Sequence, residues 1–325
     1  MMSSRVLTFD ELESYQQAVR ATDATLYVTG RGAFSGELVQ IELHGLWLQR
    51  GTESLGRICY SASDPKRAPI MFLADMDEAP MQHCGLEFRP GEVAVYKQGS
   101  TSLHRTFGRG RWATMSLAPE DLAAAGRAIV DRELEPPTDT YAFRPAAASM
   151  TRLMALHQAA VALATSASPA GATSGTSKAL QQHLVHAMVR CLAEPTAGDA
   201  RSGFRQHTRI IGRFEDFLAS RRYESVYLAE MCAAIGVSER TLRTCCQEHF
   251  GMGPVRYLWL RRMHLARRSL LRADAGTVNV TTVATEYGFW ELGRFSVEYR
   301  ALFGESPSAA LRRPLNATHE RTAWP

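Results

Sequence analysis

The last third of the chain contains an internal repeat, which restricts the possible fold more than any other feature of the sequence. The two copies cover residues 228–254 and 280–307. In each copy a short segment with apolar periodicity ends at a glycine, and a second segment ends at Phe-Gly-x-x-Pro. The first glycines, Gly236 and Gly288, are 52 residues apart and the Phe-Gly pairs are 53 apart. One residue has therefore been added near the start of the second segment of copy two.

Each copy has the pattern of a helix-turn-helix unit. A glycine suits the tight turn, where φ is often positive, and Ser238 is a natural N-cap for the helix that follows. Apolar side chains at helical spacing are expected to pack the two helices together: Leu228, Met231, Cys232, Ile235, Leu242 and Cys246. This packing leaves an outward face on the second helix, formed by Glu239, Arg240, Arg243, Thr244 and Gln247.

Residues 254–271 between the two copies are predicted to form one helix of about 18 residues, roughly 27 Å long. Major grooves on one face of DNA are roughly 34 Å apart, so this helix and the units at its ends fit two successive grooves. The helix also carries a series of arginines: Arg256, Arg261, Arg262, Arg267, Arg268 and Arg272.

The positive charge of the chain is concentrated in residues 204–315. This segment has 17 arginines, no lysine and 11 acidic residues, a net charge of +6, whereas the whole chain has +4. A localised basic surface is expected of a protein that binds the phosphate backbone of DNA. The alternative is a solvated helical face with no partner.

Residues 205–313 resemble the DNA-binding domain of the AraC family of bacterial transcription regulators. The resemblance depends on the string Tyr287-Gly288-Phe289, then Phe295, Tyr299 and Phe303-Gly304-Glu305-Ser306-Pro307. It implies a seven-helix domain with two helix-turn-helix units, commonly preceded by a cupin-like β domain that senses an effector or mediates dimerisation. It also implies that bases are contacted from the exposed start of each second helix.

The resemblance and the outward faces together give a set of candidate DNA-binding residues: Ser238, Glu239, Arg240, Thr241, Arg243, Thr244, Gln247, Trp290, Glu291, Leu292, Arg294, Ser296 and Arg300. In the first unit Arg240 and Arg243 are the best candidates for guanine recognition, because arginine can donate two hydrogen bonds to O6 and N7. A phosphate contact or a solvated side chain is the alternative for each. Glu239 is better explained by the helix dipole than by recognition of cytosine.

The matching positions of the second unit, Leu292, Gly293, Ser296 and Val297, offer few hydrogen-bonding groups. This departs from a polar face. We expect this unit to contribute backbone contacts through Arg294 and Arg300, recognition of DNA shape, or an apolar contact to a thymine methyl group. Trp290 could touch DNA, although an aromatic residue beside Phe289 more often packs in a core.

The N-terminal part is expected to be rich in β-structure, and the fold class is α+β. Apolar residues alternate with polar ones at 39–44 and 112–117, which is typical of half-buried strands, and glycine turns recur between them. We predict a cupin-like β sandwich or barrel at 1–145, amphipathic helices at 146–203, an all-α double helix-turn-helix domain at 204–315 and a tail at 316–325. A Ser/Ala/Thr/Gly/Pro-rich loop is expected at 165–177.

The amphipathic segments 150–163 and 179–193 have two interpretations. They could pair between two chains, as linker helices of the family often do, or pack against their own β domain. A homodimer is expected, because doubling the binding sites lengthens the DNA footprint and raises affinity.

An effector site cannot be assigned from the sequence. Seven residues are candidates without a basis for choosing among them: Trp47, Arg57, Tyr60, Phe72, Met81, His83 and Tyr96. His44, His83 and His104 do not form a His-x-His motif with a following carboxylate, so no metal or other cofactor is expected. The six cysteines show no C-x-x-C pair and are expected to be reduced.

These features favour a sequence-specific transcription regulator. The resemblance further implies an activator that contacts RNA polymerase and responds to an unknown small effector. An enzyme is disfavoured because no metal triad, nucleophile constellation or phosphate loop is visible. A non-specific architectural DNA binder would explain the charge but not the matching turns of the two copies. No apolar run reaches the roughly 20 residues of a membrane span and no signal peptide is visible, so a cytoplasmic protein is expected.

Overall fold

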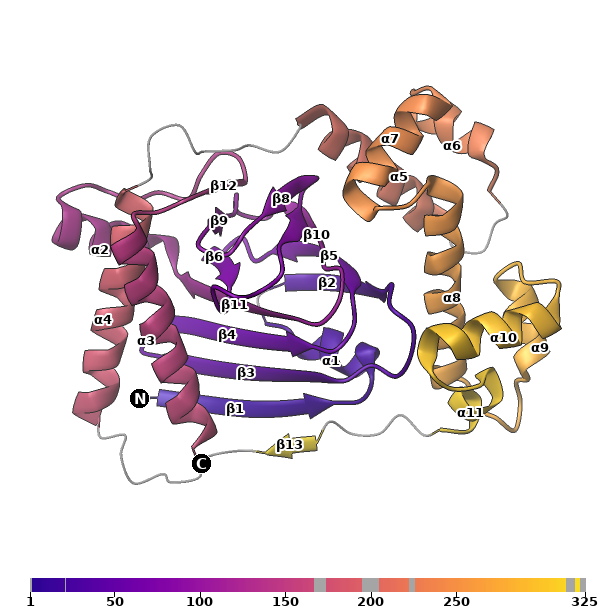
Figure 1. Cartoon of the computed structure of the whole chain (residues 1–325), viewed down its shortest axis with the longest axis horizontal. Coiled ribbons are helices and arrows are strands. Elements are labelled where there is room, and N and C mark those ends of the chain that lie inside the picture. Colours follow the sequence, from indigo (N-terminus) through magenta and orange to yellow (C-terminus); the bar gives the residue numbers. More distant parts are fainter. Residues whose placement is uncertain are drawn as a thin grey trace.

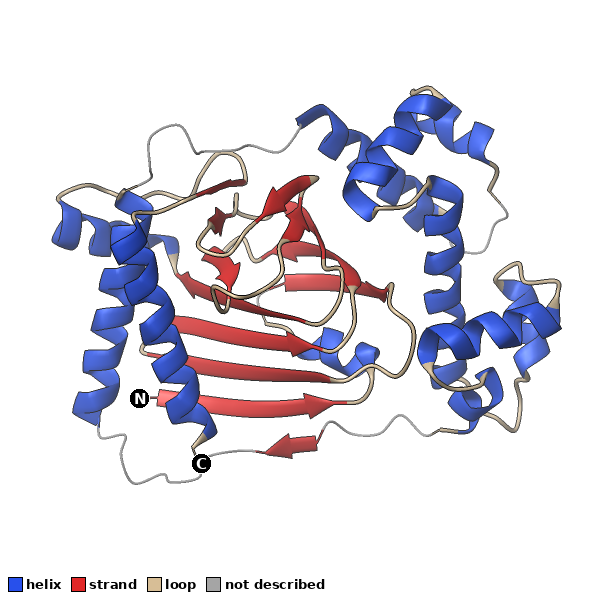
Figure 2. Cartoon of the chain, viewed as in Figure 1, coloured by secondary structure: helices blue, strands red, loops and turns tan. Residues whose placement is uncertain are grey.

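Two antiparallel sheets face each other in the N-terminal part of the chain, and a helical domain lies against one side of them (Figures 1 and 2). The computed structural model describes residues 2–20, 22–166, 174–194, 205–221, 226–313 and 319–321. Within these residues the strand order of each sheet is open rather than closed into a barrel. The predicted α+β class with a β sandwich is therefore confirmed.

The larger sheet consists, in spatial order, of β12 (Tyr141–Phe143), β9 (Val93–Val95), β6 (Ala68–Leu73), β11 (Gly110–Leu117), β4 (Leu46–Glu53), β3 (Gly36–Leu43), β1 (Met2–Phe9) and β13 (His319–Arg321). The smaller sheet consists of β2 (Thr22–Val28), β5 (Arg57–Ser63), β10 (Thr101–Arg105), β7 (Met81–His83) and β8 (Leu86–Phe88). The backbone of 319–321, expected to be part of a tail, pairs with β1 at the sheet edge.

Both faces of β3 are buried, which differs from the half-buried strand predicted by its alternation. Val39, Ile41 and Leu43 face a core shared with helices, as expected. Gln40, expected to be solvated, is only 3% exposed, and its amide donates to the Ala18 carbonyl of the Leu12–Ala18 helix at 2.6 Å and to Gln49 Oε1 at 3.2 Å. The polar side of the strand is therefore enclosed at Gln40, whereas Glu42 is partly exposed.

Three helices cover the outer face of the larger sheet: α2 (Pro119–Val130), α3 (Ala147–Thr165) and α4 (Ser174–Ala193). Leu153 of α3 and Leu184 and Met188 of α4 are fully buried in a core that these helices share with the sheet. Within one chain these stripes therefore pack on their own β domain, and a homodimer remains a prediction. Helix α4 begins inside the segment predicted to be a loop, most of which lies outside the described residues.

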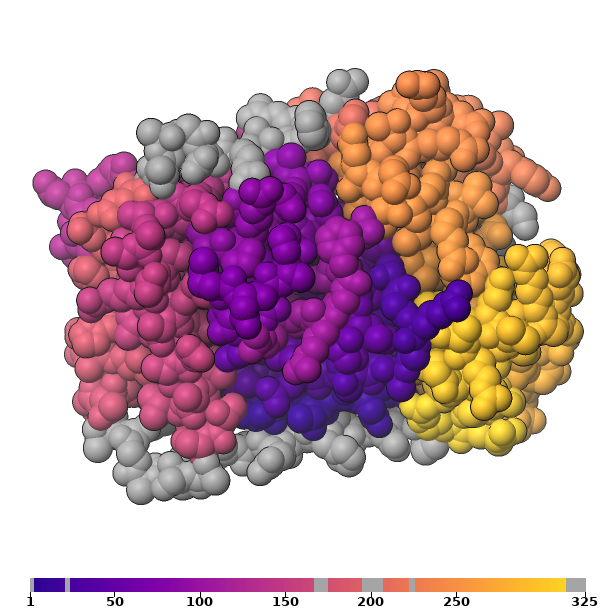
Figure 3. Space-filling model, in the orientation of Figure 1, coloured from indigo at the N-terminus to yellow at the C-terminus, as the bar shows by residue number. Residues whose placement is uncertain are grey.

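Seven helices follow in the described part of 205–313: α5 (Arg205–Ser220), α6 (Leu228–Ile235), α7 (Glu239–Phe250), α8 (Pro254–Arg272), α9 (Val280–Glu286), α10 (Leu292–Phe303) and α11 (Pro307–Arg312). Helix α8 joins the two units and matches the predicted helix to within one residue. Figure 3 shows this domain packed directly against the strands. None of the described helices is long and apolar enough to cross a membrane.

A single apolar core runs through both parts of the chain. It contains Leu26, Tyr27 and Ile58 of the smaller sheet together with Tyr257 and Met263 of α8. The Tyr27 ring meets the ring of Tyr257 edge-on at 6.1 Å and that of His264 at 5.2 Å. The position of α8 on the smaller sheet is thus fixed by burial of aromatic side chains.

Candidate DNA-binding surface and interior cavity

The first unit is formed by α6, a glycine turn and α7. Gly236 has φ 74°, a conformation that costs other residues more, and its position ends α6. The hydroxyl of Ser238 accepts a hydrogen bond from the Thr241 backbone N–H at 3.1 Å and caps α7 as predicted. Leu242 and Cys246 are fully buried beneath the turn. The local sequence therefore fixes which face of α7 points outward.

The outward face of α7 consists of the expected side chains, all exposed: Glu239, Arg240, Arg243, Thr244 and Gln247. The Arg243 guanidinium donates from Nε to Glu239 one turn earlier at 2.9 Å, so it must leave this pair to contact a base. Arg240 makes no ion pair with any described residue. Its guanidinium is thus the more available donor on this helix.

The second unit presents the same geometry with different chemistry. Gly288 has φ 78°, and Phe295, Tyr299 and Phe303 bury the inner face of α10. The outer positions are again exposed: Leu292, Gly293, Ser296, Val297 and Arg300. These lie 53 residues after the outward positions of α7, so the repeat is also a structural repeat.

Trp290 does not pack in the core, although its position beside Phe289 favoured packing. Its side chain is 74% exposed. Phe289 packs instead on Phe295, with ring centroids 4.9 Å apart. Glu291 and Arg294 are exposed beside it, and Arg294 pairs with Glu298 at 3.0 Å. All thirteen candidate residues lie on the two units, and only Thr241 is partly buried.

The arginines of α8 are divided between two roles that the sequence did not distinguish. Arg256 is exposed and stacks over the ring of Trp259 at 3.6 Å. Arg261 and Arg267 are instead buried, and Arg261 donates to the Leu218 carbonyl at 2.9 Å. The basic surface is therefore smaller than the net charge of the segment suggested.

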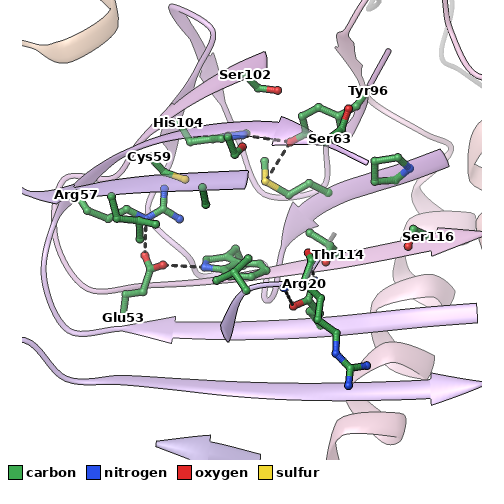
Figure 4. Close-up of a pocket in the computed structure, with 18 of the residues that line it drawn as sticks. Arg20, Glu53, Arg57, Cys59, Ser63, Tyr96, Ser102, His104, Thr114 and Ser116 are labelled. Atoms are coloured by element: carbon green, nitrogen blue, oxygen red, sulfur yellow. Dashed lines mark hydrogen bonds and ion pairs between the residues drawn. The ribbon is translucent and has the colours of Figure 1, made fainter. Parts of the chain in front are cut away.

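A cavity of about 90 Å³ lies between the two sheets (Figure 4). Its wall is made by nineteen residues, among them Tyr15, Arg20, Gln49, Glu53, Arg57, Cys59, Met71, Tyr96, His104 and Trp112. Since one water needs only roughly 10–15 Å³ measured in this way, the space is large enough for several non-hydrogen atoms. Of the seven residues considered from the sequence, Arg57 and Tyr96 line this cavity; the others do not.

Glu53 is the centre of the polar wall. Its carboxylate accepts hydrogen bonds from the Tyr15 hydroxyl at 3.0 Å and the Trp112 indole N–H at 2.9 Å, and it pairs with Arg57 at 2.8 Å. Arg57 is itself buried, and its Nη1 has no hydrogen-bond partner. An unsatisfied buried guanidinium nitrogen is costly, so the wall offers a donor to any molecule that enters with an acceptor.

The histidines of the smaller sheet do not form a metal site in the described residues. His83 and His104 lie side by side on β7 and β10, with ring centroids 4.8 Å apart. Burial lowers the pKa of both imidazoles, to about 4 for His83. No further His, Cys, Asp or Glu joins them at ligand spacing in the described part of the chain. His44 lies elsewhere, with Nε2 3.4 Å from the Ser177 hydroxyl.

Helix α1 (Leu12–Ala18) connects the cavity with the helical domain. Tyr15, together with Val19 and Arg20 just after the helix, lines the cavity. On the other side of α1, Gln16 accepts a hydrogen bond from Arg268 at 2.8 Å, and Glu11 and Glu13 pair with Arg267 at 2.6 Å and 3.5 Å. Sequence patterns missed this link, because its partners are separated by about 250 residues.

Comparisons with known proteins match the C-terminal domain. A family model described as "Helix-turn-helix domain" matches residues 231–313. The probable thc operon regulatory protein of Rhodococcus erythropolis is 40% identical over 97 residues, 30% of this chain and 29% of that protein. The XylDLEGF operon transcriptional activator 2 of Pseudomonas putida is 32% identical over 112 residues, 34% of this chain and 71% of that protein. The match thus spans under a third of the Rhodococcus relative.

Solved structures of similar proteins include the AraC-like transcriptional activator CuxR, at 12% identity and a TM-score of 0.42, covering 81% of this chain and 94% of that one. A probable AraC family regulator from Rhodopseudomonas palustris is 29% identical, with a TM-score of 0.30, covering 32% of this chain and 95% of that one. The extent of the match to the Pseudomonas activator, together with the two capped units of α6–α7 and α9–α10, identifies this chain as a member of the AraC family of DNA-binding transcription regulators.

Proposed function

We propose that this chain is a cytoplasmic, sequence-specific transcription activator whose DNA binding is controlled by a small molecule in the cavity between its sheets. The relatives named above are described as an operon regulatory protein and an operon transcriptional activator. As an activator the protein would contact RNA polymerase, and we expect it to bind DNA as a homodimer. Light scattering of the purified protein alone and with DNA tests the dimer directly.

The exposed face of α7 supports sequence-specific binding, because its two arginines can each donate two hydrogen bonds to a guanine. Selection of bound sequences from a random DNA pool, with the full-length protein at near-physiological salt, tests this step. An enriched G-containing half-site is expected. Binding without any enriched sequence would instead support a non-specific architectural protein.

The observation that carries effector control is the position of α1 between the cavity and α8. A molecule that contacts Tyr15 or displaces its bond to Glu53 acts on a seven-residue helix whose other side holds Arg267 and Arg268. A ligand shifts a conformational equilibrium only through different contacts in the two states, and α1 is the element that both sites share.

The coupling is tested without knowing the ligand. Glu13→Gln alters a carboxylate that faces α8 and lies outside the DNA-binding surface, so we expect operator affinity to change at least threefold. Glu37→Gln, on an exposed position of β3, is the matched control and should change nothing. Equal operator affinities for both variants would show that α1 does not couple the cavity to DNA binding.

The ligand itself is sought by thermal shift with a panel of small metabolites. We expect hits to carry a hydrogen-bond acceptor for Arg57 Nη1 and to lose their effect in Arg57→Lys, which keeps the charge but lacks the guanidinium fork. Hits that bind Arg57→Lys equally well would place the ligand elsewhere.

A further inference from the structure

The exposed face of α10 is unusually apolar for a solvent-facing helix. Trp290, Leu292 and Val297 are 74%, 37% and 71% exposed. They are three of eight large apolar side chains exposed in the described residues and lie within eight positions of one another. Single exposed apolar residues need no explanation, but a cluster indicates a surface that is covered by a partner.

The internal repeat indicates what that partner is. Leu292, Ser296 and Val297 occupy the positions of Glu239, Arg243 and Thr244 in α7, 53 residues earlier. The inner faces match as well, because Phe295 and Tyr299 are buried where Leu242 and Cys246 are buried. If the outer face of α7 meets base edges, the same face of α10 lies in the same relation to DNA.

The α10 face has few groups that can form the hydrogen bonds used to recognise guanine or adenine. The Ser296 hydroxyl donates to the Leu292 carbonyl at 3.0 Å, and Arg294 is paired with Glu298. In the major groove the remaining distinctive feature is the C5 methyl group of thymine, which is recognised by apolar contact.

Gly293 supports a close approach of the helix to DNA. A Cβ atom placed on this residue would meet nothing within 4 Å, so packing inside the protein does not require glycine here. Glycine at this position instead lets the first turn of α10 come nearer to a groove than any larger residue would.

We propose that Leu292 and Val297, with Trp290 beside them, contact thymine methyl groups, so that the DNA site has two chemically different halves. The first unit binds a G-containing half through hydrogen bonds, and the second binds a thymine-containing half through apolar contact. This inference rests on the proposed sequence-specific DNA binding. Arg300, which makes no ion pair with a described residue, supplies a phosphate contact at the same helix.

The test removes single methyl groups from DNA. In a site obtained by selection, each thymine is replaced in turn by deoxyuridine, which lacks only the C5 methyl, and the Kd is measured at fixed salt. We expect about fourfold weaker binding for each contacted methyl group, confined to one half of the site. Equal affinity at every replaced position would overturn the proposal.

Protein variants assign the effect to α10. Val297→Ala and Leu292→Ala should remove the sensitivity to deoxyuridine while binding to the G-containing half is retained. Leu163→Ala, the same substitution at a 50% exposed leucine of α3, is the control and should leave the sensitivity intact. Gly293→Ala should weaken DNA binding without lowering the unfolding temperature, since helix propensity favours alanine.

Two results separate failure of this inference from failure of the proposed function. If the α10 variants bind DNA normally but lose transcription with purified RNA polymerase, the surface docks a protein and the proposal is wrong. If selection enriches no sequence at all, the proposed sequence-specific binding is wrong, and the assignment of α10 to thymine is wrong with it.

Discussion

Arg267 of α8 and Glu11, the residue that precedes α1, form an ion pair of 2.6 Å across the boundary between the β-sheets and the helical domain, and both side chains are at most 10% exposed. Glu305, before α11, pairs with the same guanidinium at 2.6 Å, and Arg313 lies against both carboxylates. The connection between the two domains is therefore a buried charge network set beside the aromatic contacts of Tyr27.

We expect Arg267→Ala to lower the free energy of unfolding by about 3–5 kcal/mol, because it leaves buried carboxylates without their partner. Urea unfolding followed by fluorescence measures this loss. Arg272→Ala, at the exposed end of the same helix, should stay within about 0.5 kcal/mol of the wild type. A small effect of Arg267→Ala would mean that the network is open to solvent.

Gly304→Ala should loosen the contact between the domains. Gly304 has φ 77°, and a Cβ atom there would meet the Ala33 backbone nitrogen at 2.7 Å. Gly236→Ala is a matched control, since Gly236 has φ 74° but open space around it. In the control, the free energy of unfolding should fall by about 1 kcal/mol from backbone strain alone. In Gly304→Ala it should fall clearly more, and proteolysis between the domains should be faster. Equal losses would show that the loop between β2 and β3, which contains Ala33, shifts easily to make room.

Arg243→Ala and Arg240→Ala are expected to relax the preference for one or two base pairs, with losses of about 1–3 kcal/mol at those positions. Arg300→Ala should weaken binding to all sequences and reduce the dependence of log K on log salt by about one. Titrations against matched and mutated sites at several salt concentrations distinguish the two behaviours. If Arg243→Ala left the sequence preference unchanged, its assignment to a base would be wrong.

The stability of the protein should fall as the pH decreases below about 6.5. Burial holds the pKa of His83 and His157 at about 4 and that of His264 at about 3, so these imidazoles stay neutral in the folded chain. The unfolded chain takes up protons near pH 6.5, and each histidine then lowers the free energy of unfolding by up to ~1.4 kcal/mol per pH unit until its folded pKa is reached.

Urea unfolding between pH 7.5 and 4.5 measures this slope. His157→Leu removes a histidine that packs edge-on against Phe72, far from α7 and α10, and should flatten the curve. An unchanged slope in this variant would show that His157 is protonated without unfolding.

The local parts of this fold were predictable because they depend on neighbours in the chain. The Ser238 cap, the turn glycines and the Pro254 start of α8 all follow from short-range backbone chemistry. The outward face of α7 followed from helical periodicity, since Leu242 and Cys246 define the opposite face.

The failures concern contacts between residues far apart in sequence. The sequence of α8 shows six arginines but not that Arg261 and Arg267 are buried, because their partners belong to α5, α1 and the segment before α11. Glu53 and Trp112 were missed as cavity residues for the same reason: their importance arises only where two sheets face each other. For Trp290 both a DNA contact and packing beside Phe289 were considered, and only the three-dimensional direction of each ring separates the two residues.

The continuous core through Tyr27, Tyr257 and His264 limits how this protein can be recombined with others. A chimera that fuses residues 204–315 to a foreign ligand-binding domain would present to water an apolar strip of α8 and would leave Arg267 without the carboxylates of Glu11 and Glu13. To behave as an interchangeable module, the helical domain would need a host surface carrying both an aromatic contact for Tyr257 and acidic partners for Arg267. In this chain the two domains have separate topologies, but they share a core and must be transferred together.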